Sequence, residues 1–202
     1  MPITINGNGT VTGLSVGGLP DGSVDRDTLA TAAKGTILQV KNTTYNATTD
    51  ISCSTQNQYY TVSDIDVTIT PTATSSKMLL NAHIMGEGDH QDYHWHYRFA
   101  KTVGGTTTAL TVGATAGSRV LCLGLPPTGY YSNDQSTTPV SFAIPEFYDS
   151  PSTTSAITYH VQLACNSSSK TWYLNNCRDG GSDDNSSVER GVSWLTVKEV
   201  AQ

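Results

Sequence analysis

From Thr36 to Val200 the chain is built almost entirely of short segments in which apolar and polar residues alternate. The clearest segment runs from Tyr93 to Phe99, where an aromatic residue occupies every second position and His or Arg the positions between. A period of two places successive side chains on opposite faces of a strand, so this segment predicts a half-buried antiparallel strand. Such a strand needs neighbours on both edges, and the pattern therefore predicts a sheet protein.

Segments of the same kind recur along the chain, with separators rich in Gly, Pro, Asn, Asp and Ser. We expect strands at residues 36–40, 65–69, 78–84, 93–99, 108–112, 119–123, 140–144, 156–165, 171–175 and 192–200. Strands at this spacing predict an all-β fold, an antiparallel β-sandwich of jelly-roll type. Charged residues make up only 14% of the chain, against about 25% in ordinary domains, so its surface is built largely from hydroxyl groups.

Residues 1–23 differ from the rest, because glycines repeatedly interrupt their apolar residues. Strands this short cannot bury a core by themselves, and the simplest partners are copies of the same segment in a symmetric oligomer. A flexible tail is the alternative interpretation. The apolar residues concerned are Ile3, Ile5, Val11, Leu14, Val16 and Leu19.

A short helix is expected next, capped by Ser23 or Asp25 and extending to about Ala33. Gly35 then suits a left-handed helix stop. We therefore divide the chain into residues 1–34, a docking and trimerisation segment that includes this helix, and residues 35–202, a β-sandwich knob domain.

The charge and hydropathy of the chain argue against two classes of partner. A formal net charge of -6 with scattered Lys and Arg gives no basic patch, so we expect no nucleic acid. No apolar run approaches the ~20 residues of a membrane span, and we expect no membrane insertion. The first residues lack the pattern of a signal peptide, which predicts assembly in a cytoplasm.

The four cysteines form no C-x-x-C pair, so a zinc or redox site is not indicated. Cys165 and Cys177 flank a predicted hairpin and are expected near each other. Since the compartment is reducing, we expect reduced thiols packed in the sandwich.

Residues 9–30, GTVTGLSVGGLPDGSVDRDTLA, and residues 33–40, AKGTILQV, resemble the opening of fibre-like structural proteins of marine tailed phages, cyanophages included. Residues 67–80, VTITPTATSSKMLL, and 193–201, SWLTVKEVA, are similar to later phrases of the same proteins. The resemblance touches both ends and the first half of the sandwich, and it does not extend to residues 86–187. It implies a homotrimer with a C-terminal knob and a place on the virion.

His94 and His96 are two residues apart, so both rings are expected on one face of a strand. On a threefold axis three copies would present six imidazoles, which suit first-row transition metals. The other interpretation makes these histidines the polar side of a strand whose aromatic side fills the core. A catalytic zinc site would need a third ligand and an acid or base, for which only His83, His90 and Glu87 are available.

A glycan hydrolase would need two carboxylates across a sugar groove. Glu146 with Asp149 and Glu87 with Asp89 are close in sequence, and we expect all four to be solvated loop residues. The sequence has no nucleophile elbow and no phosphate-binding loop. We therefore expect no catalytic residues, no cofactor and no metal.

Two turn-rich stretches present aromatic residues suited to contact surfaces, residues 126–131 with Tyr130 and Tyr131, and residues 146–148 with Tyr148. They are expected either to stack on sugars of a host polysaccharide or to pack on the sandwich rim or the trimer contact. Residues 183–185, Asp-Asp-Asn, lack the spacing of a calcium loop and are interpreted as a solvated turn.

These observations together predict a non-enzymatic structural component of a tailed-phage virion, a trimeric tail fibre or tail-associated knob that takes part in host attachment. Its expected partners are two further copies, other virion proteins bound through residues 1–34, and a host surface glycan. One alternative is a head fibre or capsid decoration protein. Another, from a different class, is a small glycan-degrading or metal-dependent enzyme.

Overall fold

A computed structural model describes residues 4–5, 11–12, 37–89, 94–110, 113–114, 117–127, 139–178 and 189–201. The chain divides into two compact units, Met1–Thr36 and Ile37–Gln202. In the first unit, β1 (Thr4–Ile5) pairs with β2 (Val11–Thr12) in antiparallel register. The helix expected near residues 23–33 lies outside the described residues.

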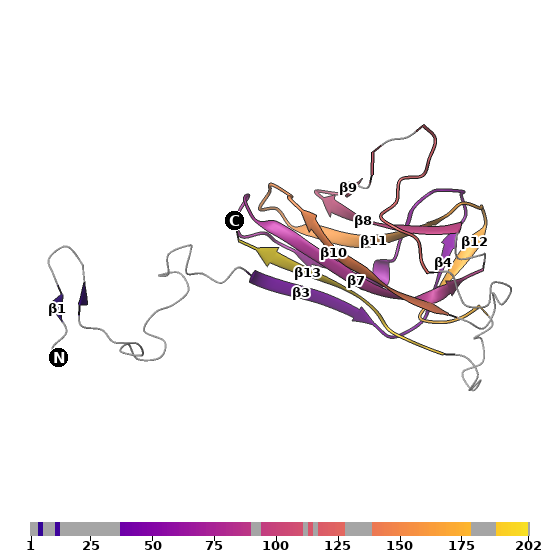
Figure 1. Ribbon diagram of the computed structural model, residues 1–202, viewed down its shortest axis with the longest axis horizontal. Coiled ribbons are helices and arrows are strands. Elements are labelled where there is room, and N and C mark those ends of the chain that lie inside the picture. Colours follow the sequence, from indigo (N-terminus) through magenta and orange to yellow (C-terminus); the bar gives the residue numbers. More distant parts are fainter. Residues whose placement is uncertain are drawn as a thin grey trace. The chain divides into compact units, whose positions relative to one another are not determined.

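The second unit, the knob domain, is made of antiparallel strands in two sheets (Figure 1). Its strands are β3 (Ile37–Tyr45), β4 (Thr49–Cys53), β5 (Tyr60–Thr61), β6 (Val67–Ile69), β7 (Lys77–Gly88), β8 (Trp95–Val103), β9 (Thr106–Ala109), β10 (Val140–Asp149), β11 (Ile157–Cys165), β12 (Lys170–Leu174) and β13 (Ser193–Val200). A short 3-10 helix, η2 (Ser63–Ile65), separates β5 from β6.

The six-stranded sheet is organised around β7, the longest strand. β13 and β12 pair in succession with Lys77–His83 and Gly86–Gly88, while β10 pairs with a stretch that overlaps both. A strand has two edges, so β12 and β13 share one edge and β10 takes the other. β3 and β4 then pair with β13 and β12 respectively.

The five-stranded sheet has the order β5-β11-β8-β9, with β6 also on β11. If β3 and β4, β5 and β6, and β12 and β13 are each counted as one position, eight positions remain. Their orders in the two sheets are 1-8-3-6 and 2-7-4-5, the connectivity of a jelly roll. The sequence prediction of an antiparallel jelly-roll sandwich is therefore confirmed for the knob domain.

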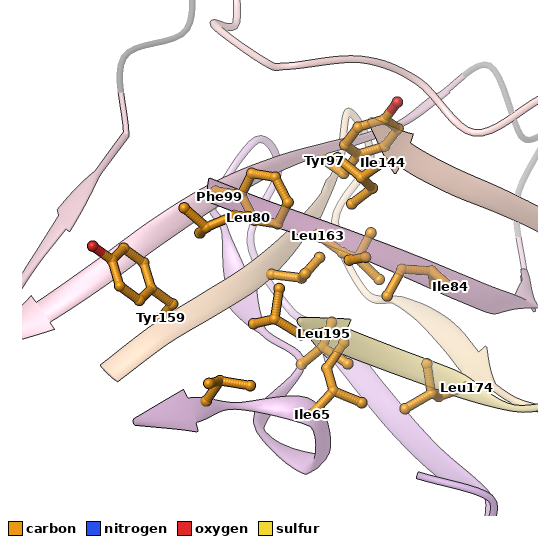
Figure 2. Packing of buried hydrophobic residues seen from close by; sticks show 14 of the residues in the cluster. Ile65, Leu80, Ile84, Tyr97, Phe99, Ile144, Tyr159, Leu163, Leu174 and Leu195 are labelled. Atoms are coloured by element: carbon orange, nitrogen blue, oxygen red, sulfur yellow. The ribbon is translucent and has the colours of Figure 1, made fainter. Parts of the chain in front are cut away.

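The core lies between the two sheets and is filled by the inward side of each alternation (Figure 2). Trp95 of β8 and Trp172 of β12 are fully buried, and their rings meet edge to face at 5.4 Å between centroids. These rings come from opposite sheets, so the contact joins the two layers. Gly88 lies directly beside the indole of Trp95, where any β-carbon would collide with the ring.

Several expected strands differ from the observed ones; the strand expected at 108–112, for example, is β9 at Thr106–Ala109. Residues 119–123 form no named strand. Instead, isolated backbone hydrogen bonds join this segment to the edge of β8, among them the bond from Leu123 N–H to the Tyr97 carbonyl at 2.8 Å. Ile65 belongs to η2, and the strand begins at Val67. β10 extends past residue 144 to Asp149, because a register shift after Ile144 accommodates Pro145.

Candidate functional site

The predicted histidine pair is divided by the start of β8. His94 precedes the strand, and His96 lies within it on the face opposite the core residues Trp95 and Tyr97. The aromatic side of the strand fills the core as expected, but His96 is only 5% exposed, so it is not a solvated residue. Burial lowers the pKa of His96 from its ordinary 6.5, and a hydrogen bond involving the backbone of His94 opposes this only in part.

Tyr59 packs against His96. Its ring meets the imidazole edge to face at 5.6 Å, and the Arg98 guanidinium lies over the ring at 3.7 Å from the centroid. The Tyr59 hydroxyl donates to the Leu121 carbonyl at 2.8 Å, and Arg98 Nε donates to Gln162 Oε1 at 2.8 Å. Burial raises the pKa of Tyr59 to about 12, so the hydroxyl remains a donor. This cluster fastens a loop to the sheet and has the character of structural packing.

The carboxylates predicted as solvated loop residues lie instead on strands, apart from Asp89, which follows the end of β7. Glu87 is 2% exposed, and its Oε2 accepts the Arg178 backbone N–H at 2.9 Å. Glu146 is half exposed and forms an ion pair with Lys198 at 3.1 Å. The prediction of solvation is therefore wrong for Glu87, because the strand pattern of residues 85–88 was hidden by two glycines.

Asp149 is the second carboxylate for which that prediction is wrong. It is the last residue of β10, and it is 9% exposed. Lys101 Nζ donates to both of its oxygens at 2.8 Å, and the Tyr159 hydroxyl donates to Oδ2 at 2.7 Å. Burial, followed by the contact with Asp149, raises the pKa of Tyr159, so its hydroxyl stays protonated. The carboxylate is held from two strands, β8 and β11.

A pocket of about 310 Å³ opens beside this ion pair, between the end of β9 and the end of β10. It is lined by Lys101, Ala109, Leu110, Phe147, Tyr148, Asp149 and Ser150. Tyr148 is 64% exposed, more than any other large hydrophobic residue in the described part of the chain. The expected aromatic stretch at residues 146–148 thus lies at a pocket, although on a strand and not in a turn.

Glu199 is a further buried carboxylate, near the end of β13, and it is fully buried. Its Oε1 accepts the Thr72 backbone N–H at 2.7 Å and the Thr72 and Ser76 hydroxyls at 2.6 Å, while Gln39 Nε2 donates to Oε2 at 2.6 Å. Burial raises the pKa of Glu199, but these hydrogen bonds outweigh it and hold the pKa below the ordinary 4.5.

The cysteine prediction is partly wrong. β11, which ends at Cys165, and β12, which precedes Cys177, belong to different sheets, so the segment between them is a crossover and not a hairpin. Neither of these two cysteines is in a disulfide, and both are buried, as expected for reduced thiols packed in the sandwich. Burial, then the neighbouring Cys165, raises the pKa of Cys53 to about 12.

Sequence reasoning missed Lys101 and Tyr159, because each is an ordinary strand residue until the fold brings its partner close. It missed Tyr59 because that residue lies outside the strands, in a segment without a motif. Tyr130, Tyr131, His90 and residues 183–185 lie outside the described residues. Within the described ranges no group of three or more His, Cys, Asp or Glu is arranged to hold a metal ion. The described part of the chain also has no helix of the length and apolarity that crossing a membrane would require.

No protein-family model matches the chain, and no curated protein matches its sequence. Among solved structures, the crystal structure of the VP2 subviral particle of infectious bursal disease virus matches with a TM-score of 0.30 and 13% identity over 81% of this chain. The structure of the Gx strain of the same virus matches with a TM-score of 0.29 and 14% identity over 81% of this chain. The chain spans 38% and 37% of the length of these two structures.

Proposed function

We propose that this chain is a non-enzymatic structural component of a tailed-phage virion, a homotrimeric tail fibre or tail-associated knob that takes part in host attachment. The observation that carries the proposal is a combination of two parts of the chain. Residues 1–34, the glycine-rich leader, include residues 9–30, which resemble phage fibre openings, and a jelly-roll domain follows them. Jelly rolls manage their sheet edges by packing two sheets together, and they serve as capsid and lectin domains.

The trimer is supported by the size of the first unit's sheet. The described strands of this unit, β1 and β2, are two residues each and pair in the register Thr4 to Thr12 and Ile5 to Val11. A two-stranded pair of this length is marginal in water without further strands or packing. Copies related by symmetry supply the missing strands at no cost in new sequence.

A non-enzymatic role is supported by the partners of the carboxylates. Asp149 is bound by Lys101 and Tyr159, Glu87 accepts a backbone N–H, and Glu146 pairs with Lys198. A hydrolase needs two carboxylates that face each other across a substrate groove. These three face groups of their own domain instead, and so they fit a scaffold that works by multivalent contact.

The proposal is tested first by the mass of the purified full-length protein, measured by light scattering. Three copies are expected, and a lone subunit at high concentration would overturn the fibre assignment. Deletion of residues 1–34 is expected to leave a folded knob domain that no longer joins the virion. Normal incorporation of the deleted form would refute the docking role of the leader.

Two further measurements separate the alternatives. Cryo-electron microscopy of the virion places the protein on the tail, as proposed, or on the head, which would make it a head fibre or decoration protein. Incubation with host polysaccharide, with and without a chelator, is expected to yield no cleavage. Turnover that the chelator abolishes would make the chain a metal-dependent enzyme.

A further inference from the structure

We propose that the pocket between β9 and β10 binds one residue of a neutral carbohydrate, with Tyr148 as the stacking surface and the Lys101–Asp149 pair as the hydrogen-bonding group. This rests on the proposed role in host attachment and assigns a position and a ligand class to it. The pocket volume of about 310 Å³ is at the lower end of ligand pockets, which suits a single small residue.

Both residues of the ion pair line the pocket, and the pair has unused hydrogen-bonding capacity. A carboxylate offers about four acceptor positions, and the three bonds from Lys101 and Tyr159 leave about one for a ligand. The Lys101 ammonium has three donors, of which Asp149 uses two. One donor and one acceptor therefore stand side by side, and two neighbouring hydroxyls of a sugar ring supply the complementary pair.

The pair is also held in place before any ligand arrives. Lys101 and Asp149 side chains are 19% and 10% exposed, so both are largely fixed by packing yet still reach solvent. The Tyr159 hydroxyl fixes Asp149 from the fully buried side. A preorganised polar group loses little entropy on binding, which is the condition for recognising a weakly bound ligand.

Tyr148 supplies the apolar contact. It stands on a strand, paired with Leu79 of β7, and not on a loop. A ring that is 64% exposed at the rim of a pocket can be covered by the C–H face of a sugar with little loss of side-chain entropy. Aromatic faces and hydroxyl partners together match the two kinds of surface that a pyranose presents.

Charge favours a neutral sugar over an acidic one. Asp149 already neutralises Lys101, so the pocket offers no unpaired cation to a carboxylate or sulfate group. The whole chain has a formal net charge of -6, which further disfavours an anionic ligand. A neutral hexose needs no compensation of charge and uses only the two remaining hydrogen bonds.

The experiment uses the full-length protein and saturation-transfer NMR with the methyl glycosides of glucose, galactose and mannose, with methyl glucuronide as the acidic probe. Transfer to at least one neutral hexose is expected, with weak or no transfer to glucuronide. Tyr148→Ala and Asp149→Asn are each expected to weaken the affinity at least tenfold. Leu125→Ala, which removes another exposed apolar side chain away from the pocket, is the matched control and is expected to leave the affinity unchanged.

Absence of transfer to every neutral hexose, or equal affinity of Tyr148→Ala and the wild type, would overturn the pocket assignment. Light scattering on the same samples keeps this failure distinct from that of the fibre proposal. A trimer without hexose binding refutes only the pocket, and a monomer with hexose binding refutes only the fibre. A trimer that Tyr148→Ala dissociates would make the pocket a contact between copies and also overturns the carbohydrate assignment.

Discussion

Glu199 and Asp149 are both buried carboxylates near strand ends, yet their surroundings differ. Glu199 is fully buried, and neutral groups of Gln39, Thr72 and Ser76 occupy both of its oxygens. Asp149 is bound by a lysine and a tyrosine and borders a pocket. The carboxylate of Glu199 thus fastens two segments of the domain and is closed to ligands, whereas the carboxylate of Asp149 is accessible from the pocket.

The comparison teaches that burial alone does not identify a site. Every hydrogen bond around Glu199 comes from the strand and loop that it fastens, and nothing about it is left for a ligand. In the Lys101–Asp149 pair, the attraction between the two charges offsets the cost of removing them from water, and the pair still reaches solvent. Saturation of the partners, and not the degree of burial, separates the two carboxylates.

The largest effect is expected for Glu199→Ala. The change leaves the Thr72 N–H, two hydroxyls and the Gln39 amide without their acceptor in a closed site, where unpaired buried donors are costly. We expect a loss of about 3 kcal/mol in the free energy of unfolding, measured by urea denaturation. A loss of stability no greater than that of a surface mutation would show that these donors find other partners and that the site is not closed.

A smaller effect is expected on acidification, which keeps the Glu199 side chain and removes only its charge. Its pKa is lowered in the fold, so the stability it contributes is present above the ordinary value of 4.5 and is lost as the pH falls below it. His96 also has a lowered pKa, and its contribution declines as the pH falls below 6.5. The free energy of unfolding, measured from pH 7 to pH 3, is expected to decrease in these two pH ranges. His96→Gln should remove the decrease only in the upper range.

A change of about 1 kcal/mol is expected for Asp149→Asn, because the pair is partly solvated and the freed Lys101 can reach water. The asparagine oxygen still accepts from Tyr159. Urea denaturation measures the difference, and hexose binding is expected to fall far more than stability does. If Asp149→Asn proves as destabilising as Glu199→Ala, the contrast between the structural carboxylate of Glu199 and the accessible carboxylate of Asp149 disappears.

The smallest effect on folding is expected for Tyr148→Ala, within about 0.5 kcal/mol of the wild type, since most of the side chain faces solvent. The thermal midpoint of unfolding provides the measurement. A marked fall would mean that Tyr148 supports the fold and would remove the reason to assign it to a ligand.

The alternation of residues 93–99 was enough to predict a strand whose aromatic side lies in the core, and Trp95, Tyr97 and Phe99 are all core residues. The period of two depends only on the geometry of a single strand, so it can be read locally. The eight-position connectivity was predicted only as a type, because strand order depends on long-range pairing such as that of β3 with β13.

The candidate site could be predicted only in part. The sequence predicts Tyr148 as a candidate contact residue, but the register shift after Ile144, within the strand that carries Tyr148, has no clear sequence signal besides Pro145. Lys101 and Asp149 are 48 residues apart in the chain, and nothing in the sequence pairs them before the two sheets meet. The sequence predicts a solvated Asp149 because a carboxylate near turn residues usually is solvated, and the ion pair with Lys101 overrides that rule.

The jelly-roll order places the first and last strand positions of the knob domain side by side, with Ile37 opposite Val200 (Figure 1). Residues 54–59 and 166–169 gather at the other end, where the Asn57 N–H bonds the Cys165 carbonyl at 2.7 Å. The length of β7 separates the two ends by about 35 Å. A foreign peptide inserted among residues 54–56 would therefore be displayed far from residue 37, where the domain begins, which makes this end the natural place for sequence variation or for engineered cargo.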